Sequence, residues 1–292
     1  MRIRMALQWS DVEVFLAVAE KKTLSQAAGY LNVSIPTVTR RIDALEKELG
    51  VKLLRRTIRG ATLTEAGNRA LEDARAGARH MKKFTRAAKA ALQNGLRIPI
   101  RISSTEPMIS RVLAPNLGSL LEQIPDVGIE FDIDTGLSDL TWGDIDIAVR
   151  LARPQIDSYV GRALKKIELS LYCSKRYLRR RDPLALNLDE EELLWLDAKY
   201  QGIPENLWLV EHQLESRARL RSGSIRALEE ACLAGIGIAP LPRFSAPPSL
   251  VEVAGPSLPP RQPWVVFHKD TRSNKRMRVV RDWIVQSCEA VF

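Results

Sequence analysis

The sequence contains few of the residues on which secreted scaffolds and metal sites depend. Its 292 residues include only three cysteines and three histidines. Cys173, Cys232 and Cys288 are widely spaced and odd in number, which argues against a disulfide framework and against a zinc site. We therefore expect reduced thiols. A redox-sensing cysteine is the alternative. It would need a low pKa and an exposed thiol, and the sequence shows neither property.

Signatures of catalysis are equally scarce. His80, His212 and His268 have no partners at catalytic spacing. The GIG at 235–237 lacks the third glycine of a phosphate-binding loop and follows a predicted helix, so it suits a helix cap and a strand entry. The acidic run at 189–192 is typical of a solvated helix start. We predict no enzyme, no catalytic residue, no metal and no cofactor.

Long hydrophobic runs are also missing. No apolar stretch approaches the roughly 18 residues that span a bilayer. The N-terminus is interrupted by Asp11 and Glu13 and has no cleavage site of small residues, so it does not resemble a signal peptide. We predict a soluble, cytoplasmic protein. The hydrophobic fraction of 45% is ample for packed cores, and the length suggests two domains.

The positive charge is confined to the first third of the chain. Residues 1–94 contain 18 Lys and Arg against 9 Asp and Glu, whereas residues 95–292 contain 26 of each. A basic segment next to a neutral one indicates a polyanionic partner for the N-terminal part, with nucleic acid as the first candidate. Membrane attraction would also need a basic face, but no lipidation motif accompanies it.

Two amphipathic helical patterns meet within residues 24–49. Both have the i, i+3/i+4, i+7 spacing of a helix that buries one face, and only a tight turn fits between them. The apolar positions are Leu24, Ala27, Ala28 and Leu31 in the first pattern, and Val38, Ile42, Leu45 and Leu49 in the second. Ser34 stands at the N-cap of the second helix, with Pro36 in its first turn. The pattern predicts a helix-turn-helix; a solvated helical hairpin is the alternative.

Hydroxyl and guanidinium groups on this second helix are of the kinds that reach base edges and phosphates. We predict major-groove contacts from Ser34, Pro36, Thr37, Thr39 and Arg40. Arg41 and Lys47 could as easily be solvated.

The flanking segments complete a winged module over residues 1–64. Residues 10–20 form a predicted first helix capped by Ser10 or Asp11, and Gly50 is the predicted C-cap of the third. The alternation of residues 51–64 predicts a two-stranded hairpin, the wing. Its arginines are available for phosphates or the minor groove: Arg55, Arg56 and Arg59.

One long helix is predicted over residues 65–94. Its apolar positions recur at alternating steps of three and four, which favours a helix that pairs with another helix. These positions are Leu71, Ala74, Ala78, Met81, Thr85, Ala88 and Leu92. Dimerisation would match a two-fold DNA site. The alternative is a helix that lies on its own domain.

The remainder, residues 95–292, alternates strand and helix patterns, which is typical of an α/β fold with parallel sheets. Predicted strands occupy 96–104, 127–134, 145–152, 168–174, 193–197, 207–212, 236–242 and 263–268, and predicted helices 111–124, 136–144, 175–181, 224–235 and 274–291. We expect two halves: subdomain I at about 95–164 and 268–292, and subdomain II at about 165–267.

Over essentially its full length the chain resembles the LysR-type transcriptional regulators. The resemblance rests on SDVEVFLAVAEKKTLSQAAGYLNVSIPTVTRRIDALEKELGVKLLRR, LTEAGNRAL, GDIDIAVR and AGIGIAPLP. It implies a winged helix-turn-helix DNA-binding domain, a linker helix that forms a dimer contact, and a two-subdomain α/β effector domain resembling periplasmic solute-binding proteins, commonly in tetramers. Ile35 departs from the frequent Gln, which removes a base-edge hydrogen bond but permits contact with a thymine methyl. Leu54 replaces the frequent Phe, a mild core change.

Polar residues at predicted strand ends and helix starts are the candidate effector site. Hydroxyls and free amides at a helix N-terminus suit an anion, and α/β sheets bind ligands at the carboxyl ends of their strands. The candidates are Ser103, Ser104, Thr105, Thr135, Arg150, Ser222 and Ser224. We expect a small metabolite that carries a carboxylate. The alternative is that these residues are only helix caps and loop hydroxyls.

The predicted function is a ligand-responsive regulator that binds double-stranded DNA as a homodimer or homotetramer, through contacts of the linker helix and the effector domain. The rival is a solute-binding or interaction protein whose N-terminal module only oligomerises. The charge confined to residues 1–94 speaks against that rival.

Overall fold

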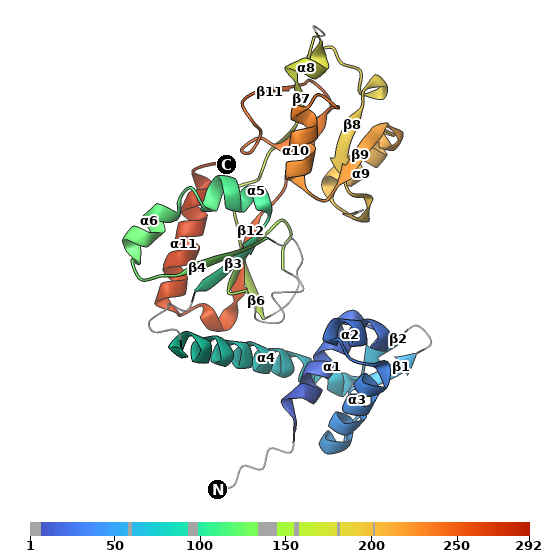
Figure 1. Cartoon of the computed structure of the whole chain (residues 1–292), viewed down its shortest axis with the longest axis vertical. Coiled ribbons are helices and arrows are strands. Elements are labelled where there is room, and N and C mark those ends of the chain that lie inside the picture. The colour runs from blue at the N-terminus through green and yellow to red at the C-terminus, as the bar shows by residue number, and fades with distance from the viewer. Residues whose placement is uncertain are drawn as a thin grey trace. The chain divides into compact units, whose positions relative to one another are not determined.

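The computed structural model describes residues 7–57, 60–92, 99–133, 145–154, 158–179, 182–200 and 202–292 (Figure 1). These residues form two compact units. The N-terminal unit extends to residue 92, and the effector unit comprises 99–133 and the chain from residue 146 onward. The predicted helix at 136–144 and the side chains of Arg59 and Thr135 lie outside the described residues.

The N-terminal unit is a helical bundle with a wing. Its elements are α1 (Trp9–Lys21), α2 (Leu24–Leu31), α3 (Ile35–Leu49), β1 (Leu54–Thr57), β2 (Gly60–Leu63) and α4 (Glu65–Leu92). The core is formed by the apolar faces of the first three helices, with Phe15, Val18, Ala27, Val38 and Ile42 all buried. The fold therefore uses the helical patterns that the sequence predicts.

Backbone capping fixes where these helices begin and end. The Thr23 side chain accepts a hydrogen bond from the Gln26 amide, and Ser34 does the same for Thr37 at the start of α3. Gly50 ends α3 in the left-handed conformation, as predicted. The predicted cap of α1 was wrong: the N-cap is Gln8, without a side-chain hydrogen bond.

Helix α4 is one continuous helix, and among the side chains that the structure describes those packed on its own unit lie in its first half. Ala78 is buried, and Ala70, Leu71 and Ala74 lie against the same core. Further along, Phe84 is 68% exposed. The interpretation of a helix that lies on its own domain therefore describes the first half, and pairing with another helix stays a prediction.

Gly67, in the first turns of α4, marks a close approach between this helix and the base of the wing. A Cβ atom placed there would lie 2.1 Å from the carbonyl oxygen of Leu53. The same turn is fastened by Thr64, whose hydroxyl donates to the Lys52 carbonyl at 2.6 Å and accepts from the Gly67 amide at 3.0 Å. The glycine of LTEAGNRAL is therefore required by packing.

The first half of the effector unit is a five-stranded sheet in the order β4-β3-β5-β12-β6. The strands are β3 (Ile100–Ser104), β4 (Ile129–Ile133), β5 (Ile147–Arg150), β6 (Tyr159–Ala163) and β12 (Trp264–His268). Strand β3 runs parallel to β4 and β5, but β12 is antiparallel to β5 and β6. The predicted parallel sheet is therefore mixed, because β12 returns from the second half of the unit in the opposite direction.

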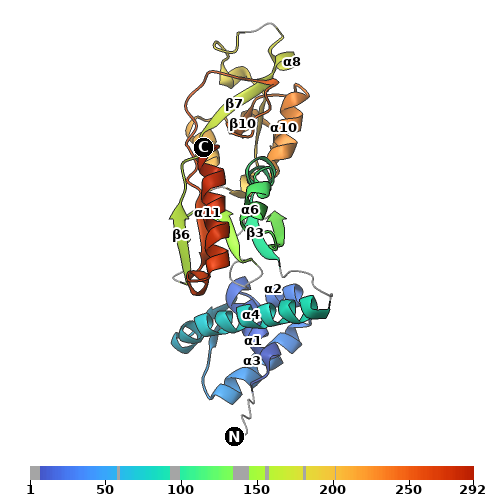
Figure 2. The same cartoon turned by 90° about the vertical axis from the view of Figure 1, so that its left-hand side faces the viewer.

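Helices cover this sheet. They are α5 (Glu106–Met108), continued by a π-helical turn (Ile109–Leu113), α6 (Leu117–Gln123) and α11 (Lys275–Glu289). In both ribbon views α11 lies beside the sheet and close to α6, and the Trp283 Nε1 donates to the Asn116 carbonyl at 3.0 Å (Figures 1 and 2). The last helix of the chain therefore packs against the first helices of the effector unit.

The second half contains β7 (Leu169–Ser174), α8 (Lys175–Leu178), β8 (Leu193–Leu196), α9 (Pro204–Glu211), β9 (Ala218–Ser222), α10 (Ile225–Leu233), β10 (Ala239–Pro242) and β11 (Leu250–Glu252). Strand β7 pairs with β10 and β11, and β8 runs parallel to β9. Two backbone bonds join the two groups of strands: the Leu194 amide donates to the Ile238 carbonyl, and the Ile238 amide donates to the Glu192 carbonyl, both at 2.8 Å.

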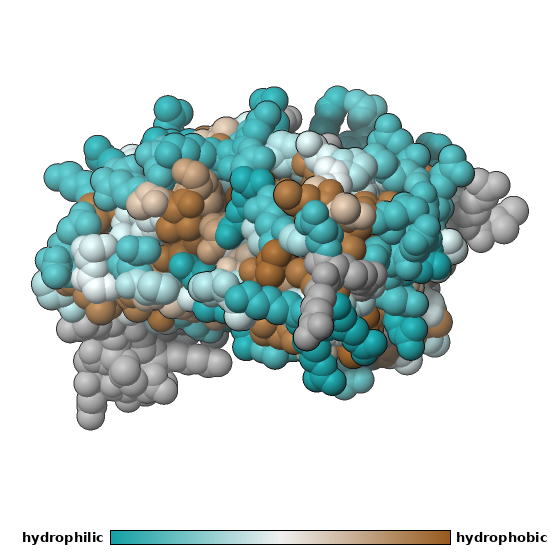
Figure 3. Space-filling model, turned by 90° about the horizontal axis from the view of Figure 1, so that it is seen from above, coloured by the Kyte–Doolittle hydropathy of each residue, from teal (hydrophilic) through white to brown (hydrophobic). Residues whose placement is uncertain are grey.

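The predicted strand at 207–212 was wrong, because this segment is helix α9. Pro204 occupies its first turn, and Trp208 and Leu209 are buried while Leu207 and Val210 are exposed. That burial follows a helical period, which a short apolar run does not distinguish from a strand. The face shown in Figure 3 has hydrophobic patches among hydrophilic residues, as is usual for folded proteins.

We expect Gly67→Ala to destabilise the N-terminal unit, because the added methyl meets the rigid carbonyl of Leu53. Denaturant unfolding should show a loss of about 1–3 kcal/mol, the usual cost of overpacking. Gly29→Ala is the control: it lies in α2 with nothing within 4 Å of its would-be Cβ, and should stabilise by up to about 1 kcal/mol. Equal effects of the two substitutions would contradict the close approach.

Candidate DNA interface and effector site

The start of α3 presents a polar surface above a buried face. Ser34, Pro36 and Arg40 are exposed, and Thr37 and Thr39 are half-buried. On the opposite side Val38, Ile42 and Leu45 are buried. The predicted groove residues of α3 therefore lie together on the side of the helix away from the core.

Two of these residues also shape the helix start. The Ser34 Oγ accepts from the Thr37 amide at 3.3 Å and lies 2.8 Å from the Thr37 Oγ1. Between them Ile35 is 46% exposed. The first turn of α3 thus combines paired hydroxyls with an apolar side chain that can approach a thymine methyl.

The wing is an antiparallel pair in which Leu54 faces Leu63 and Thr57 faces Gly60. Arg55 is exposed on β1. Arg56 lies in the same strand, with the backbone alone described, and Arg59 falls between the two strands, outside the described residues. The hairpin prediction is confirmed, and it places Arg55 at the surface.

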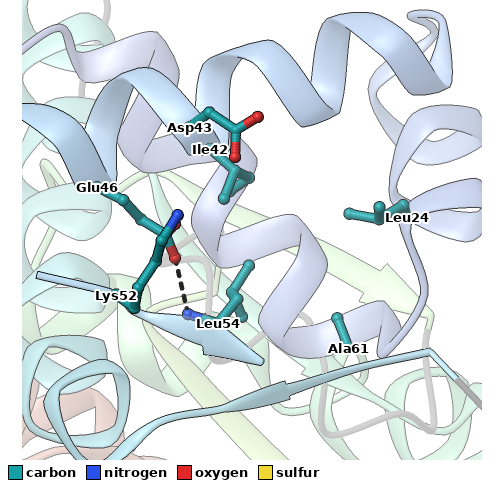
Figure 4. A pocket seen from close by; sticks show the side chains of 7 residues that line it. All are labelled: Leu24, Ile42, Asp43, Glu46, Lys52, Leu54 and Ala61. Carbon is teal, nitrogen blue, oxygen red and sulfur yellow. Dashed lines mark hydrogen bonds and ion pairs between the residues drawn. The ribbon is translucent and has the colours of Figure 1, made fainter. Parts of the chain in front are cut away.

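Sequence reasoning missed Glu46, which is buried on α3 with only 5% of its surface exposed. Its Oε1 accepts from the backbone amides of Leu53 at 2.9 Å and Leu54 at 3.0 Å. Its Oε2 lies 2.6 Å from the Lys52 Nζ. Figure 4 shows the carboxylate of α3 pointing at the start of β1. This side chain therefore connects the predicted recognition helix to the wing.

Burial by itself raises the pKa of Glu46, but the hydrogen bonds from Lys52, Leu54 and Leu53 outweigh it, so the net pKa is lowered. The carboxylate is therefore ionised near neutral pH. A cavity of about 320 Å³ lies beside it, and is lined by Leu24, Ile42, Asp43, Glu46, Lys52, Leu54 and Ala61 (Figure 4).

In the effector unit the structure brings together three of the predicted ligand residues. Arg150 is 3% exposed and its Nη2 donates to the Ser103 Oγ at 2.9 Å. Ser104 is also buried and donates to the Val149 carbonyl at 3.2 Å. The hydroxyls of Ser103 and Ser104 are therefore engaged within the protein at the ends of β3 and β5.

The other candidates lie at helix starts. Thr105 precedes α5 and is half-buried, but its side chain makes no capping bond, contrary to the cap interpretation. Ser224 caps α10 by accepting from the Ala227 amide, and Ser222 accepts from the Ser224 amide. The capping alternative thus describes Ser224, whereas Ser222 ends β9 and its hydroxyl holds the turn that leads into α10. Helices α5 and α10 are in contact, so these two groups of residues lie on neighbouring elements.

A polar group near Ser222 was not predicted. Asp197 and Lys199 follow strand β8, with their charged atoms 3.5 Å apart. The backbone amide of Lys199 lowers the pKa of the half-buried Asp197. The Arg221 Nη1 donates to the Leu196 carbonyl at 3.3 Å. The sequence does not show that β8 and β9 pair, and without this pairing nothing connects Asp197 and Lys199 with Ser222.

The cysteines do not support redox sensing. All three are buried, and none of them forms a disulfide. Burial raises the pKa of both Cys232 and Cys288 to about 12, so that these thiols stay protonated and unreactive.

Neither a membrane-spanning helix nor a metal cluster occurs among the described residues. No helix in this part of the chain is both long and apolar enough to cross a membrane. Within the same ranges no three or more His, Cys, Asp or Glu side chains are grouped so that they could hold a metal ion.

We expect the Glu46 carboxylate to make the stability of the N-terminal unit pH-dependent. A carboxylate with a lowered folded pKa stabilises above its unfolded pKa, about 4.3, and loses that contribution as the pH falls through the folded value. Glu46→Gln should therefore cost about 1–3 kcal/mol at pH 7, and the gap to wild type should close below about pH 4.

Glu48→Gln is the control for this measurement, because Glu48 is exposed on the same helix. Its unfolding curve should follow wild type at each pH. A gap between wild type and Glu46→Gln that stays constant from pH 7 to pH 3 would contradict the prediction.

Comparison with known proteins agrees with this geometry. Residues 9–68 match the bacterial regulatory helix-turn-helix protein, lysR family, and residues 93–289 match the LysR substrate binding domain. The HTH-type transcriptional regulator DmlR of Escherichia coli (strain K12) is 26% identical over 290 residues, which cover 95% of this chain and 93% of DmlR.

Solved structures share the fold. ArgP from Mycobacterium tuberculosis superposes with a TM-score of 0.60 at 18% identity, over 98% of this chain and 99% of ArgP. Full-length CbnR complexed with its target DNA gives 0.50 at 23% identity, over 97% and 100% of the two chains. The chain belongs to the LysR family, whose members are DNA-binding transcriptional regulators with an effector-binding domain, and not enzymes.

Proposed function

We propose that α3 reads the operator in the major groove and that the wing holds the DNA backbone. The observation that carries this is the outward face of α3, where Ser34, Pro36, Thr37, Thr39 and Arg40 lie opposite the buried residues. Arg40 is exposed and supplies the guanidinium that suits a guanine edge. Arg55, Arg56 and Arg59 supply charge for phosphates in the adjacent hairpin.

The protein acts as a dimer or tetramer in this proposal. LysR regulators form oligomers, and α4 offers a surface for pairing. Past Ala78 it leaves the core of its own unit, with Met81 42% and Phe84 68% exposed. A second copy of α4 would cover these side chains, and a two-fold pair of recognition helices would then meet a two-fold DNA site. Because a regulator of transcription works on the chromosome, the proposed location is the cytoplasm.

The effector in this proposal is a small carboxylate. Arg150 and Ser103 are paired at the ends of adjacent strands, with Thr105 beside them and Ser222 and Ser224 at the start of α10. Thr135 follows β4 in the sequence. A buried guanidinium with a hydroxyl can receive a carboxylate, and the helix starts offer amides. The effector would shift the population of two arrangements of the halves, provided that it binds them with different affinity.

Arg40→Ala should weaken binding to the cognate operator by about 1–3 kcal/mol, the value of a good base contact. The DNA that flanks the gene, with a scrambled fragment of equal length beside it, is titrated at several salt concentrations. Lys47→Ala is the control, because it removes the same charge from an exposed position on the same helix. Equal losses for both variants, or equal losses on both fragments, would remove Arg40 from base readout.

Arg150→Gln should lower the affinity for a carboxylate effector at least tenfold, because a hydrogen bond to a charged group contributes about 1.5–3 kcal/mol. Isothermal calorimetry with carboxylates and their methyl esters measures this. Arg153→Gln is the matched control, since Arg153 is exposed three residues further along. Binding of neutral compounds only, or equal affinity for acid and ester, would show the carboxylate proposal to be wrong.

A further inference from the structure

We propose that Glu46 is a positioning residue for DNA binding: through its hydrogen bonds to the base of the wing it sets the direction of the wing relative to α3. The wing arginines then reach the DNA backbone only while these hydrogen bonds hold. The inference rests on the proposed contact between the wing and phosphates, and it assigns a role to a residue on the side of α3 that does not face DNA.

The interaction is specific in direction. One carboxylate oxygen accepts from two successive backbone amides, of Leu53 at 2.9 Å and of Leu54 at 3.0 Å. Leu54 is the first residue of β1, and both leucines are buried. Two amides on one oxygen fix the backbone at the point where the wing begins, so Glu46 determines where β1 points (Figure 4).

The same backbone is held from the opposite side by the start of α4. The Thr64 amide donates to the Leu53 carbonyl at 2.9 Å, and the Thr64 hydroxyl donates to the Lys52 carbonyl at 2.6 Å. Without the Glu46 hydrogen bonds, residues 52–54 would keep their hydrogen bonds to the start of α4, and β2 would keep the bond from the Ala61 amide to the Lys22 carbonyl at 2.8 Å. The start of β1 would then be able to shift while β2 stays held at Ala61.

A small turn is enough to break a phosphate contact. Leu54 lies two residues before Arg56, which pairs with Ala61, and two strand residues extend about 7 Å at the usual rise of about 3.3 Å per residue. A rotation of about 10° about the attachment at Ala61 therefore moves the start of β1 by about 1 Å, which exceeds the range of about 0.5 Å over which an N–H···O hydrogen bond is made.

The ion pair alone does not explain a carboxylate here. The Lys52 side chain is 72% exposed, and ion pairs with an exposed partner usually contribute no more than about 1 kcal/mol. A negative charge next to a DNA-binding surface also opposes association. Lys52 offsets that charge, with its ammonium 2.6 Å from the Glu46 Oε2. A carboxylate supplies a hydrogen-bond acceptor for the amides of Leu53 and Leu54, and an apolar side chain cannot.

Two substitutions separate the reach of the side chain from its charge. Glu46→Asp keeps the charge but withdraws the oxygen by one methylene, and Glu46→Gln keeps the reach but removes the charge. For each variant the affinity for operator DNA is measured as a function of salt, at a temperature where circular dichroism shows it folded. The slope of log K against log salt becomes shallower by about 0.9 for every phosphate that the protein ceases to neutralise.

We expect Glu46→Asp to flatten the slope by about 0.9 or more, whereas Glu46→Gln should keep the wild-type slope. Glu48→Asp is the control, because it shortens an exposed carboxylate on the same helix, and it should behave as wild type. Arg55→Ala should flatten the slope by about 0.9, and should add less than that in the Glu46→Asp background. A variant that does not fold is measured in the Gly29→Ala background.

The outcomes distinguish the two levels of the proposal. If Arg55→Ala flattens the slope and Glu46→Asp does not, the positioning role is overturned while the wing interaction stands. If Glu46→Asp weakens binding at an unchanged slope, Glu46 acts on stability only, and the inference also fails. If Arg55→Ala leaves the slope unchanged, the interaction between the wing and phosphates is itself wrong.

Discussion

The N-terminal unit depends on how residues 52–54 are held between two helices. Glu46 of α3 binds the amides of this segment, and Thr64 at the start of α4 binds its carbonyls. Gly67 lets α4 approach the Leu53 carbonyl without a clash. The predicted recognition helix α3, the wing and α4 are therefore all bonded to residues 52–54. A displacement of one of these elements would displace the other two.

The outline of this unit could be predicted because local chemistry decides it. The periodic apolar residues of α2 and α3 give the buried face, and Ser34 and Gly50 give the ends of α3. Glu46 could not be predicted in the same way. It stands on an amphipathic helix among polar residues, where a glutamate is normally solvated, and its partners are backbone amides that no sequence pattern marks.

The effector unit was harder to predict because its sheets are completed by distant segments. Strand β12 inserts beside β5 from more than a hundred residues away, which turns a parallel pattern into a mixed sheet. Residues 207–211 form a helix in which Trp208 and Leu209 are buried while Leu207 and Val210 are exposed. Tertiary contacts of Trp208 and Leu209 therefore decide between helix and strand in this segment. Strand ends were placed well enough to bring Ser103 and Arg150 together.

The proposed effector site uses a buried charge in another way. Arg150 is buried beside Ser103 with its charge inside the protein, where the low dielectric strengthens its attraction for an anion. A guanidinium has five N–H donors, so in the proposed function it would add a carboxylate to the partners that it already has. The free energy of that proposed binding would then favour one arrangement of the halves. In the N-terminal unit the buried charge of Glu46 is held by backbone amides and Lys52. As proposed, the Glu46 carboxylate is bound by the backbone and keeps the wing in position. The Arg150 guanidinium would bind a further anion, and the effector would then change the arrangement of the halves.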